Sequence, residues 1–171
     1  MPLFRTTKKL SKALHLKLPS SLAEPVTIEH EWFADLFYVE RKKCVIWVHR
    51  ATLLTFVRPA VIANELREFH ALFRYEFRTI IASMGLKESL INRFGVYQPE
   101  AYAPTNDRAV VGSMVDYRKM FKIMIEYEGG LEHADIIALN AMLNETPMSL
   151  LGMESAVGVV RALRERSTYL N

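Results

Sequence analysis

The sequence predicts an α+β fold, with an antiparallel sheet of three or four strands and four or five helices packed on one face of that sheet. The first observation is a set of runs rich in aromatic and β-branched residues between residues 32 and 57. The second is the helical spacing of apolar residues that dominates the chain after residue 59. The third is the composition, 50% hydrophobic and 24% charged over 171 residues, which is that of an ordinary globular domain.

The chain shows no repeat, low-complexity tract or Gly/Ser-rich linker, so we expect a single domain over residues 1–171. Residues 1–58 are expected to form a basic helix and the sheet, and residues 59–171 to be mainly helical. The first helix is predicted at residues 8–15, because Thr6 and Thr7 precede it as capping residues and its leucines recur at i, i+4.

The predicted sheet occupies residues 32–57. Strands are expected at residues 32–39, 44–48 and 52–57, where Val, Ile, Phe, Tyr and Trp are frequent. The short charged segment at residues 40–43 lies between the first two runs and predicts a hairpin. The strands are therefore expected to form an antiparallel meander.

Pro59 is expected to open the clearest helix, because a proline suits the first helical position. Apolar residues then recur every three or four positions as far as Met84, and Gly85 follows as a candidate C-cap. The outer face of this helix carries charges of both signs, typical of a solvated face: Arg67, Arg74, Arg78, Glu65, Glu68 and Glu76. Shorter helices are predicted at residues 87–94, 115–127, 132–143 and 154–166, with an extended stretch near residues 96–102.

No residue pattern predicts a cofactor, a metal site or catalysis. The five histidines are scattered without the spacing of a zinc site, and the chain has neither a nucleophile elbow nor a glycine-rich phosphate loop. Cys44 is the only cysteine and lies between apolar neighbours, which favours a structural thiol and a reducing compartment. No membrane span or signal-peptide pattern is found, so we expect a cytoplasmic protein.

The string at residues 105–117 is the most unusual in the chain, because small polar residues and a glycine interrupt an apolar run. Ser113 and Asp116 have the spacing of a helix capping box, with Ser113 as the expected N-cap. Arg108 is expected to bind a carboxylate such as Asp35 or Asp116 through its planar guanidinium. The functional alternative is a small enzyme or ligand-binding domain, with an anion-binding pocket around Arg108, Ser113 and Asp116.

The amino-terminal third is the basic part of the chain. Residues 1–58 carry ten Lys/Arg and five Asp/Glu, although the net charge of the whole chain is only +3. The candidate binding residues are Lys8, Lys9, Lys12, Arg41, Lys42 and Lys43. They favour a non-enzymatic interaction module that binds a protein or nucleic-acid partner, with weak and non-specific phosphate contacts in the second case.

Five strings resemble, in order, an uncharacterised bacterial family known as a domain of unknown function, DUF6933. They are Arg5-Thr6-Thr7-Lys8-Lys9-Leu10, Trp32-Phe33-Ala34-Asp35-Leu36, Thr52-Leu53-Leu54-Thr55, Asp107-Arg108-Ala109-Val110-Val111-Gly112-Ser113-Met114-Val115-Asp116 and Leu143-Asn144-Glu145-Thr146-Pro147. The resemblance spans nearly the whole chain and implies one compact domain. It implies no particular activity, cofactor or partner.

Overall fold

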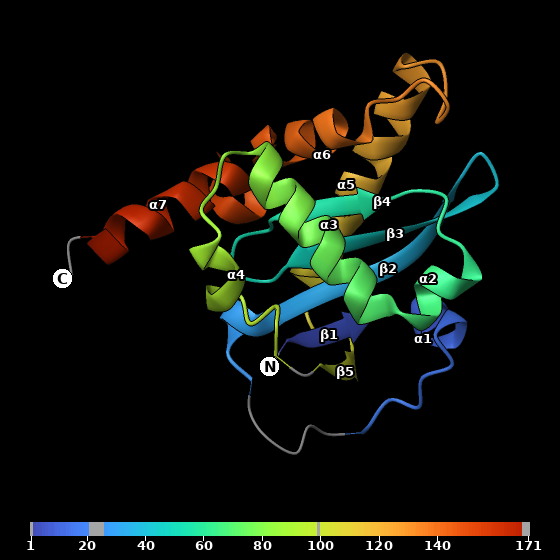
Figure 1. Cartoon of the computed structure of the whole chain (residues 1–171), viewed down its shortest axis with the longest axis horizontal. Coiled ribbons are helices and arrows are strands. Elements are labelled where there is room, and N and C mark those ends of the chain that lie inside the picture. Colours follow the sequence, from blue (N-terminus) through green and yellow to red (C-terminus); the bar gives the residue numbers. More distant parts are fainter. Residues whose placement is uncertain (1, 21–25, 99, 169–171) are drawn as a thin grey trace.

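A five-stranded mixed sheet in the order β4-β3-β2-β1-β5 forms the centre of the fold (Figure 1). The computed structural model describes residues 2–20, 26–98 and 100–168. The strands of this sheet are β1 (Leu3–Thr6), β2 (Glu31–Val39), β3 (Lys42–His49), β4 (Thr55–Arg58) and β5 (Ala101–Pro104). β2, β3 and β4 form the predicted antiparallel meander, whereas β1 runs parallel to both β2 and β5. The α+β class is confirmed, and the purely antiparallel sheet of three or four strands is wrong.

β1 is the strand that the sequence did not predict. It has only four residues, Arg5 stands inside it, and a helix begins two residues after it. Its register places Phe4 beside Trp32 of β2 and beside Tyr102 of β5. Both pairings are parallel and join residues far apart in the chain, so no turn motif next to β1 predicts them.

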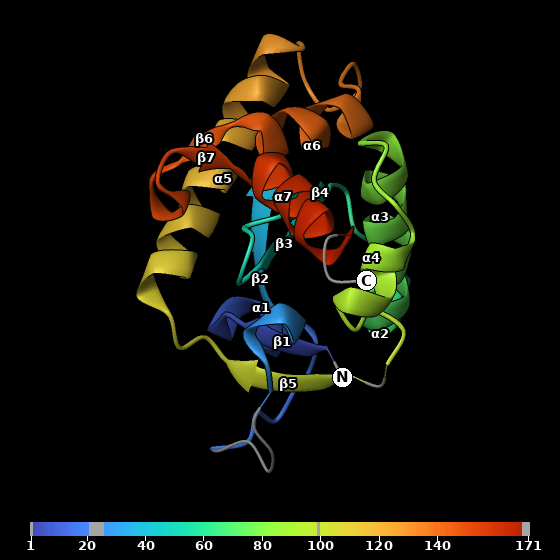
Figure 2. The ribbon, with the colours of Figure 1, turned by 90° about the vertical axis from the view of Figure 1, so that its left-hand side faces the viewer.

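Helices cover both faces of the sheet rather than one. Figure 2 looks along the sheet, with α3 on one side and α5 on the other. The helices in the described part of the chain are α1 (Lys8–Ala13), α2 (Ala63–Arg67), α3 (Phe69–Ser83), α4 (Ser89–Arg93), α5 (Arg108–Tyr127), α6 (Ile136–Glu145) and α7 (Ala156–Thr168). The short elements are the single 3₁₀ turns η1 (Ile28–His30) and η2 (Ser149–Leu151) and the two-stranded sheet of β6 (Pro147–Met148) and β7 (Glu154–Ser155).

The alternation of side chains along β2 explains why the one-face prediction is wrong. Trp32, Ala34 and Leu36 are buried in a core with α2, α3 and α4. Phe33 and Phe37 alternate with them and are buried in a second core with α5 and α6. A strand that is apolar at nearly every position is typical of a sheet buried on both faces.

The long helix predicted from Pro59 is two helices. α2 begins only at Ala63, where the Glu65 carboxylate accepts a hydrogen bond from the Ile62 backbone amide. The chain leaves helical geometry at Glu68, with φ −100° and ψ 40°, and α3 starts at the next residue. Pro59 therefore lies in the preceding connection and is not the first helical residue.

Two asparagines of α6 cover the free edge of β4. Asn144 Oδ1 accepts a hydrogen bond from the Thr55 amide (2.8 Å) and its Nδ2 donates to the Thr55 carbonyl (2.7 Å). Asn140, one turn earlier, makes the same two bonds to Val57, at 2.8 and 3.0 Å. Four edge groups that would otherwise be buried without partners are satisfied, and this sheet edge is closed to further strands.

His49, at the end of β3, is fully buried in the neutral form. Its Nε2 lies 2.8 Å from the Glu29 carbonyl oxygen and its Nδ1 lies 2.8 Å from Thr52 Oγ1. The carbonyl can only accept, so Nε2 carries the proton and Nδ1 accepts from the hydroxyl. Burial away from water lowers the pKa of His49 from 6.5 to about 4.

We therefore expect the free energy of unfolding to fall as the pH drops from about 6.5 to about 4. In this interval the unfolded chain takes up a proton on His49 that the folded chain excludes, and the pKa difference corresponds to about 3 kcal/mol. Urea unfolding at closely spaced pH values measures the loss. His49→Gln should flatten the profile in this interval, whereas His133→Gln, at an exposed site, should leave it unchanged. An equal slope in wild type and His49→Gln would contradict the assignment.

Candidate functional site

Three of the predicted binding lysines lie on α1. The helix is fixed from inside by Leu10 and Ser11, which are buried, and from its start by Thr7, whose side chain accepts a hydrogen bond from the Leu10 amide (3.4 Å). Lys8, Lys9 and Lys12 lie outside this anchored side and are exposed. The short helix thus presents three ammonium groups to solvent.

The other three predicted cations lie on the β2–β3 hairpin, which the structure confirms. Its turn consists of Glu40 and Arg41, both with positive φ (48° and 62°), which is the backbone of a type I′ turn. Val39 pairs with Lys42 and Tyr38 with Lys43 on either side of it. Arg41, Lys42 and Lys43 are all exposed.

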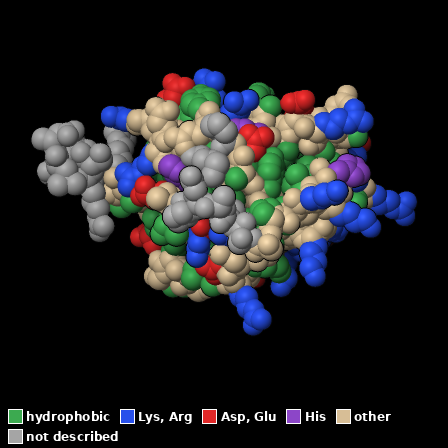
Figure 3. Space-filling view, turned by 90° about the horizontal axis from the view of Figure 1, so that it is seen from below, with side chains coloured by type: hydrophobic (Ala, Val, Ile, Leu, Met, Phe, Trp, Pro, Cys, Tyr) green, Lys and Arg blue, Asp and Glu red, His purple; other side chains and the backbone are tan. Residues whose placement is uncertain are grey.

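The structure brings these two groups of cations to the same end of the molecule. The ammonium group of Lys9 lies 4.8 Å from the centre of the Tyr38 ring, so α1 contacts the hairpin close to its turn. In Figure 3, Lys and Arg side chains gather at the right-hand end of the view, where Figure 1 places α1 and the hairpin. We call this surface the basic end and define it as Lys8, Lys9, Lys12, Arg41, Lys42 and Lys43.

Two more cations border the basic end from α5, and the sequence did not predict them. Arg118 and Lys122 lie 5.7 and 5.9 Å from the centre of the Phe37 ring. Their i, i+4 spacing shows that they share one face of the helix. Nothing local indicates that this face meets the hairpin, because α5 and β2 are about eighty residues apart in the chain.

Two carboxylates near the basic end form hydrogen bonds within the protein, Asp35 from a buried position and Glu40 from an exposed one. Asp35 is buried and accepts hydrogen bonds from Thr7 and Arg118. A Glu40 oxygen accepts a hydrogen bond from the Leu131 amide (3.0 Å). In the described part of the chain, none of the six basic-end cations forms an ion pair. Their positive charge is therefore available to an acidic partner.

The structure does not place Ser113 at a helix start. Asp107 is the N-cap of α5, and one of its carboxylate oxygens accepts from the amides of Ala109 (3.0 Å) and Val110 (3.2 Å). Ser113 is buried in the second turn, where its hydroxyl donates to the Ala109 carbonyl (3.2 Å). The predicted capping box of Ser113 and Asp116 is therefore wrong by about two turns.

Arg108 is also placed differently from the prediction. It is the first residue of α5 and is exposed, as is Asp116, whereas Ser113 is buried. Within the described residues Arg108 forms no ion pair, and Asp35 is bound to Arg118 instead. The expected bond from Arg108 to Asp35 or Asp116 is thus absent there, and the three side chains do not converge on one pocket.

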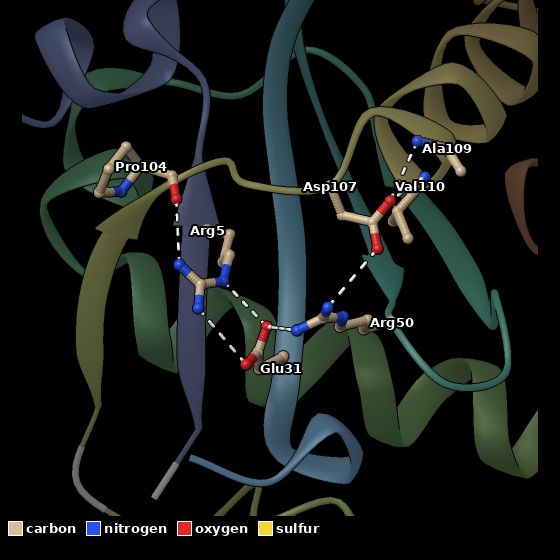
Figure 4. Close-up of polar contacts among 7 residues, drawn as sticks. All are labelled: Arg5, Glu31, Arg50, Pro104, Asp107, Ala109 and Val110. Carbon is tan, nitrogen blue, oxygen red and sulfur yellow. Dashed lines mark hydrogen bonds and ion pairs between the residues drawn. The ribbon is translucent and has the colours of Figure 1, made fainter. Parts of the chain in front are cut away.

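A charged cluster that the sequence did not reveal joins β1, β2 and β5 to the residue that follows β3 and to the N-cap of α5 (Figure 4). Glu31, whose side chain is only 4% exposed, accepts from Arg5 Nε (2.9 Å) and from Arg50 Nη1 (2.8 Å). Arg5 also donates to the Pro104 carbonyl (3.2 Å), and Arg50 reaches Asp107 at 3.6 Å. Two cations and two carboxylates balance one another, so this cluster offers no net charge to a ligand.

Cys44 and the possible metal ligands were the other candidates for a reactive site. Burial raises the pKa of the Cys44 thiol, which opposes a role as a nucleophile. Among the residues that the structure describes, no three His, Cys, Asp or Glu side chains are grouped as metal ligands. No helix in the described part has both the length and the apolar character needed to cross a membrane.

Comparison with known families gives one match. The family model described as "Domain of unknown function (DUF6933)" matches residues 3–157, which is most of the chain. A comparison with curated proteins found no match. The matched residues include the basic end, the charged cluster and the asparagines that cover β4.

Proposed function

The chain belongs to the DUF6933 family, and from its basic end we propose that it is a non-enzymatic interaction module of the bacterial cytoplasm that binds an acidic macromolecule. The preferred partner is a nucleic acid, held through its phosphates; an acidic protein is the alternative. The observation that carries the proposal is the convergence of six exposed cations from α1 and the β2–β3 hairpin, none of which forms an ion pair with the residues that the structure describes.

The geometry supports phosphate contacts without base recognition. Lysine ammonium groups on long side chains act as point charges, and they suit a phosphate backbone better than the patterned edges of bases. α1 has only six residues and is anchored on its inner side, so it is too short to follow a groove of the double helix. We therefore expect weak binding with little sequence preference.

We expect the affinity for a fluorescein-labelled DNA duplex to fall steeply with salt, because phosphate binding releases counterions. Replacing Lys8, Lys9 and Lys12 together by Gln should weaken binding to the duplex. It should also reduce the slope of log K against log salt by about one for each lost phosphate contact. Fluorescence anisotropy across a salt series measures both quantities.

The matched control replaces three exposed cations elsewhere, Lys87, Arg108 and Arg161, by Gln. This variant has the same net charge as the α1 variant and should keep most of the affinity. Equal losses in the two variants would show that only net charge matters and would contradict a defined basic end. Tight, sequence-selective binding at high salt would contradict weak phosphate contact, and binding to polyglutamate but not to DNA would make the partner an acidic protein.

A further inference from the structure

A continuous groove follows the outer side of α3. It consists of three adjoining hollows of about 440, 640 and 240 Å³. The first two share Arg74 and Tyr97, and the last two share Arg78 and Ala82. α3 forms one wall, and residues from α4 and from the connection between α4 and β5 contribute to the other.

Arginines line this groove along its length. Arg67 lies in the first hollow, Arg74 in the first and second, and Arg78 in the second and third. Arg74 and Arg78 are one turn apart, about 6 Å along the helix axis. Within the described residues Arg74 forms no ion pair, and the pair of Arg78 with Glu88 joins two well-exposed side chains, so it is weak.

The acidic residues of the same helices explain why the sequence suggested an ordinary solvated face. Glu65 and Glu76 accept from Arg58 at 2.7 and 3.2 Å, on the β4 side of the helices. They are therefore drawn away from the groove. Glu68 and Glu100 line its first hollow and Glu88 its third, so three glutamates accompany the three arginines along its length. The second hollow, lined by Arg74 and Arg78, has no acidic residue and is the cationic part of the groove.

Aromatic side chains stand beside these arginines. Tyr97 is 48% exposed at the junction of the first two hollows, and Tyr75 is 64% exposed in the second. Gln98, next to Tyr97, offers an amide with both a donor and an acceptor. The wall behind them is fixed, because the His70 ring lies 2.8 Å from Glu100 and 3.0 Å from the Val96 carbonyl oxygen.

We propose that this groove binds single-stranded nucleic acid. The arginines contact successive phosphates, and Tyr97 and Tyr75 provide ring faces on which unpaired bases stack, which is how sequence-tolerant single-strand binding is built. The length of the groove favours a strand over a compact ligand, since its arginines are spread along three adjoining hollows. Stacking on tyrosine also requires bases free of a duplex. The proposal rests on α3 and its neighbours and is independent of the basic end.

The test compares the binding of a single-stranded oligonucleotide, the corresponding duplex and free AMP by the full chain. Arg74→Ala with Tyr97→Ala should weaken single-strand binding at least tenfold and change duplex binding less than twofold. Arg108→Ala with Tyr127→Ala is the matched control, because both residues are exposed outside the groove. Tyr97→Trp should retain affinity and show fluorescence quenching when a base stacks on the new ring.

Each outcome decides the proposal. The proposal is supported if the groove variant loses affinity for the single strand alone and the control variant keeps its affinity. It is also supported if the groove variant still loses only single-strand affinity after Lys8, Lys9 and Lys12 have been neutralised. The proposal is overturned if the groove variant loses affinity for single strand and duplex equally, or if its affinity does not change. It is also overturned if the wild-type chain does not bind the single strand. Binding of AMP as tight as that of the oligonucleotide would assign the groove to a free nucleotide, and binding of an acidic peptide alone would assign it to a protein partner.

Discussion

Asn144→Ala is expected to lower the free energy of unfolding by about 2–6 kcal/mol, because it leaves the Thr55 amide and carbonyl without partners and each such buried group costs about 1–3 kcal/mol. The side chain is fully buried, so water does not replace it. Asn144→Asp should be at least as damaging, since it keeps the acceptor but loses the donor and buries a charge. Urea denaturation, with the slope of the transition checked for each variant, gives the values.

A control from the same helix separates this effect from the general effect of substituting alanine in α6. Met142 is 50% exposed, and Met142→Ala should change the stability by no more than about 0.5 kcal/mol. If Asn144→Ala were as mild as Met142→Ala, the asparagine would not be the cover of the β4 edge. The uncovered edge also predicts that Asn144→Ala aggregates more readily on heating.

Glu31→Ala is expected to cost about 3–5 kcal/mol, because the Arg5 guanidinium then stays buried without its carboxylate. Arg50 is more exposed than Arg5 and keeps Asp107 as a partner, so most of the loss falls on Arg5. Thermal and urea unfolding of the variant measure it.

The double variant Arg5→Met with Glu31→Leu identifies the origin of that loss. Replacing both partners of a buried pair by apolar side chains of similar size is often close to neutral, whereas removing one partner is not. The double variant should therefore be clearly more stable than Glu31→Ala. If both were equally unstable, packing around Glu31 and not the unpaired charge would be responsible.

The meander of β2, β3 and β4 could be predicted because its information is local. Apolar runs end at a charged turn, and the two-residue connection at Glu40 and Arg41 sets the register. β1 could not be predicted in the same way, because its four residues become a strand only between β2 and β5, which are distant in the chain. The same holds for Asn144: its sequence position indicates a helix end, and only the packing of α6 against β4 gives the side chain its partners.

In the candidate site, too, the features that depend on nearby residues could be predicted and those that depend on tertiary packing could not. The exposure of Lys8, Lys9 and Lys12 followed from amphipathic spacing, and that of the hairpin cations from turn chemistry. The contact of Lys9 with Tyr38, which joins the two groups, is a tertiary feature. The capping prediction at Ser113 failed because the Asp107 carboxylate accepts from two free amides and starts the helix earlier. Ser113 and Asp116 have the spacing of a capping box, but they lie inside the helix and cap nothing.

The most direct test of the basic end is an amide chemical-shift titration of the ¹⁵N-labelled full chain with a DNA duplex at low salt. We expect the largest chemical-shift changes on residues 8–12 of α1 and residues 38–43 of the hairpin, and we expect both sets of changes to disappear as salt is added. Changes concentrated at Arg108 and the first turns of α5, with α1 and the hairpin unaffected, would contradict this expectation.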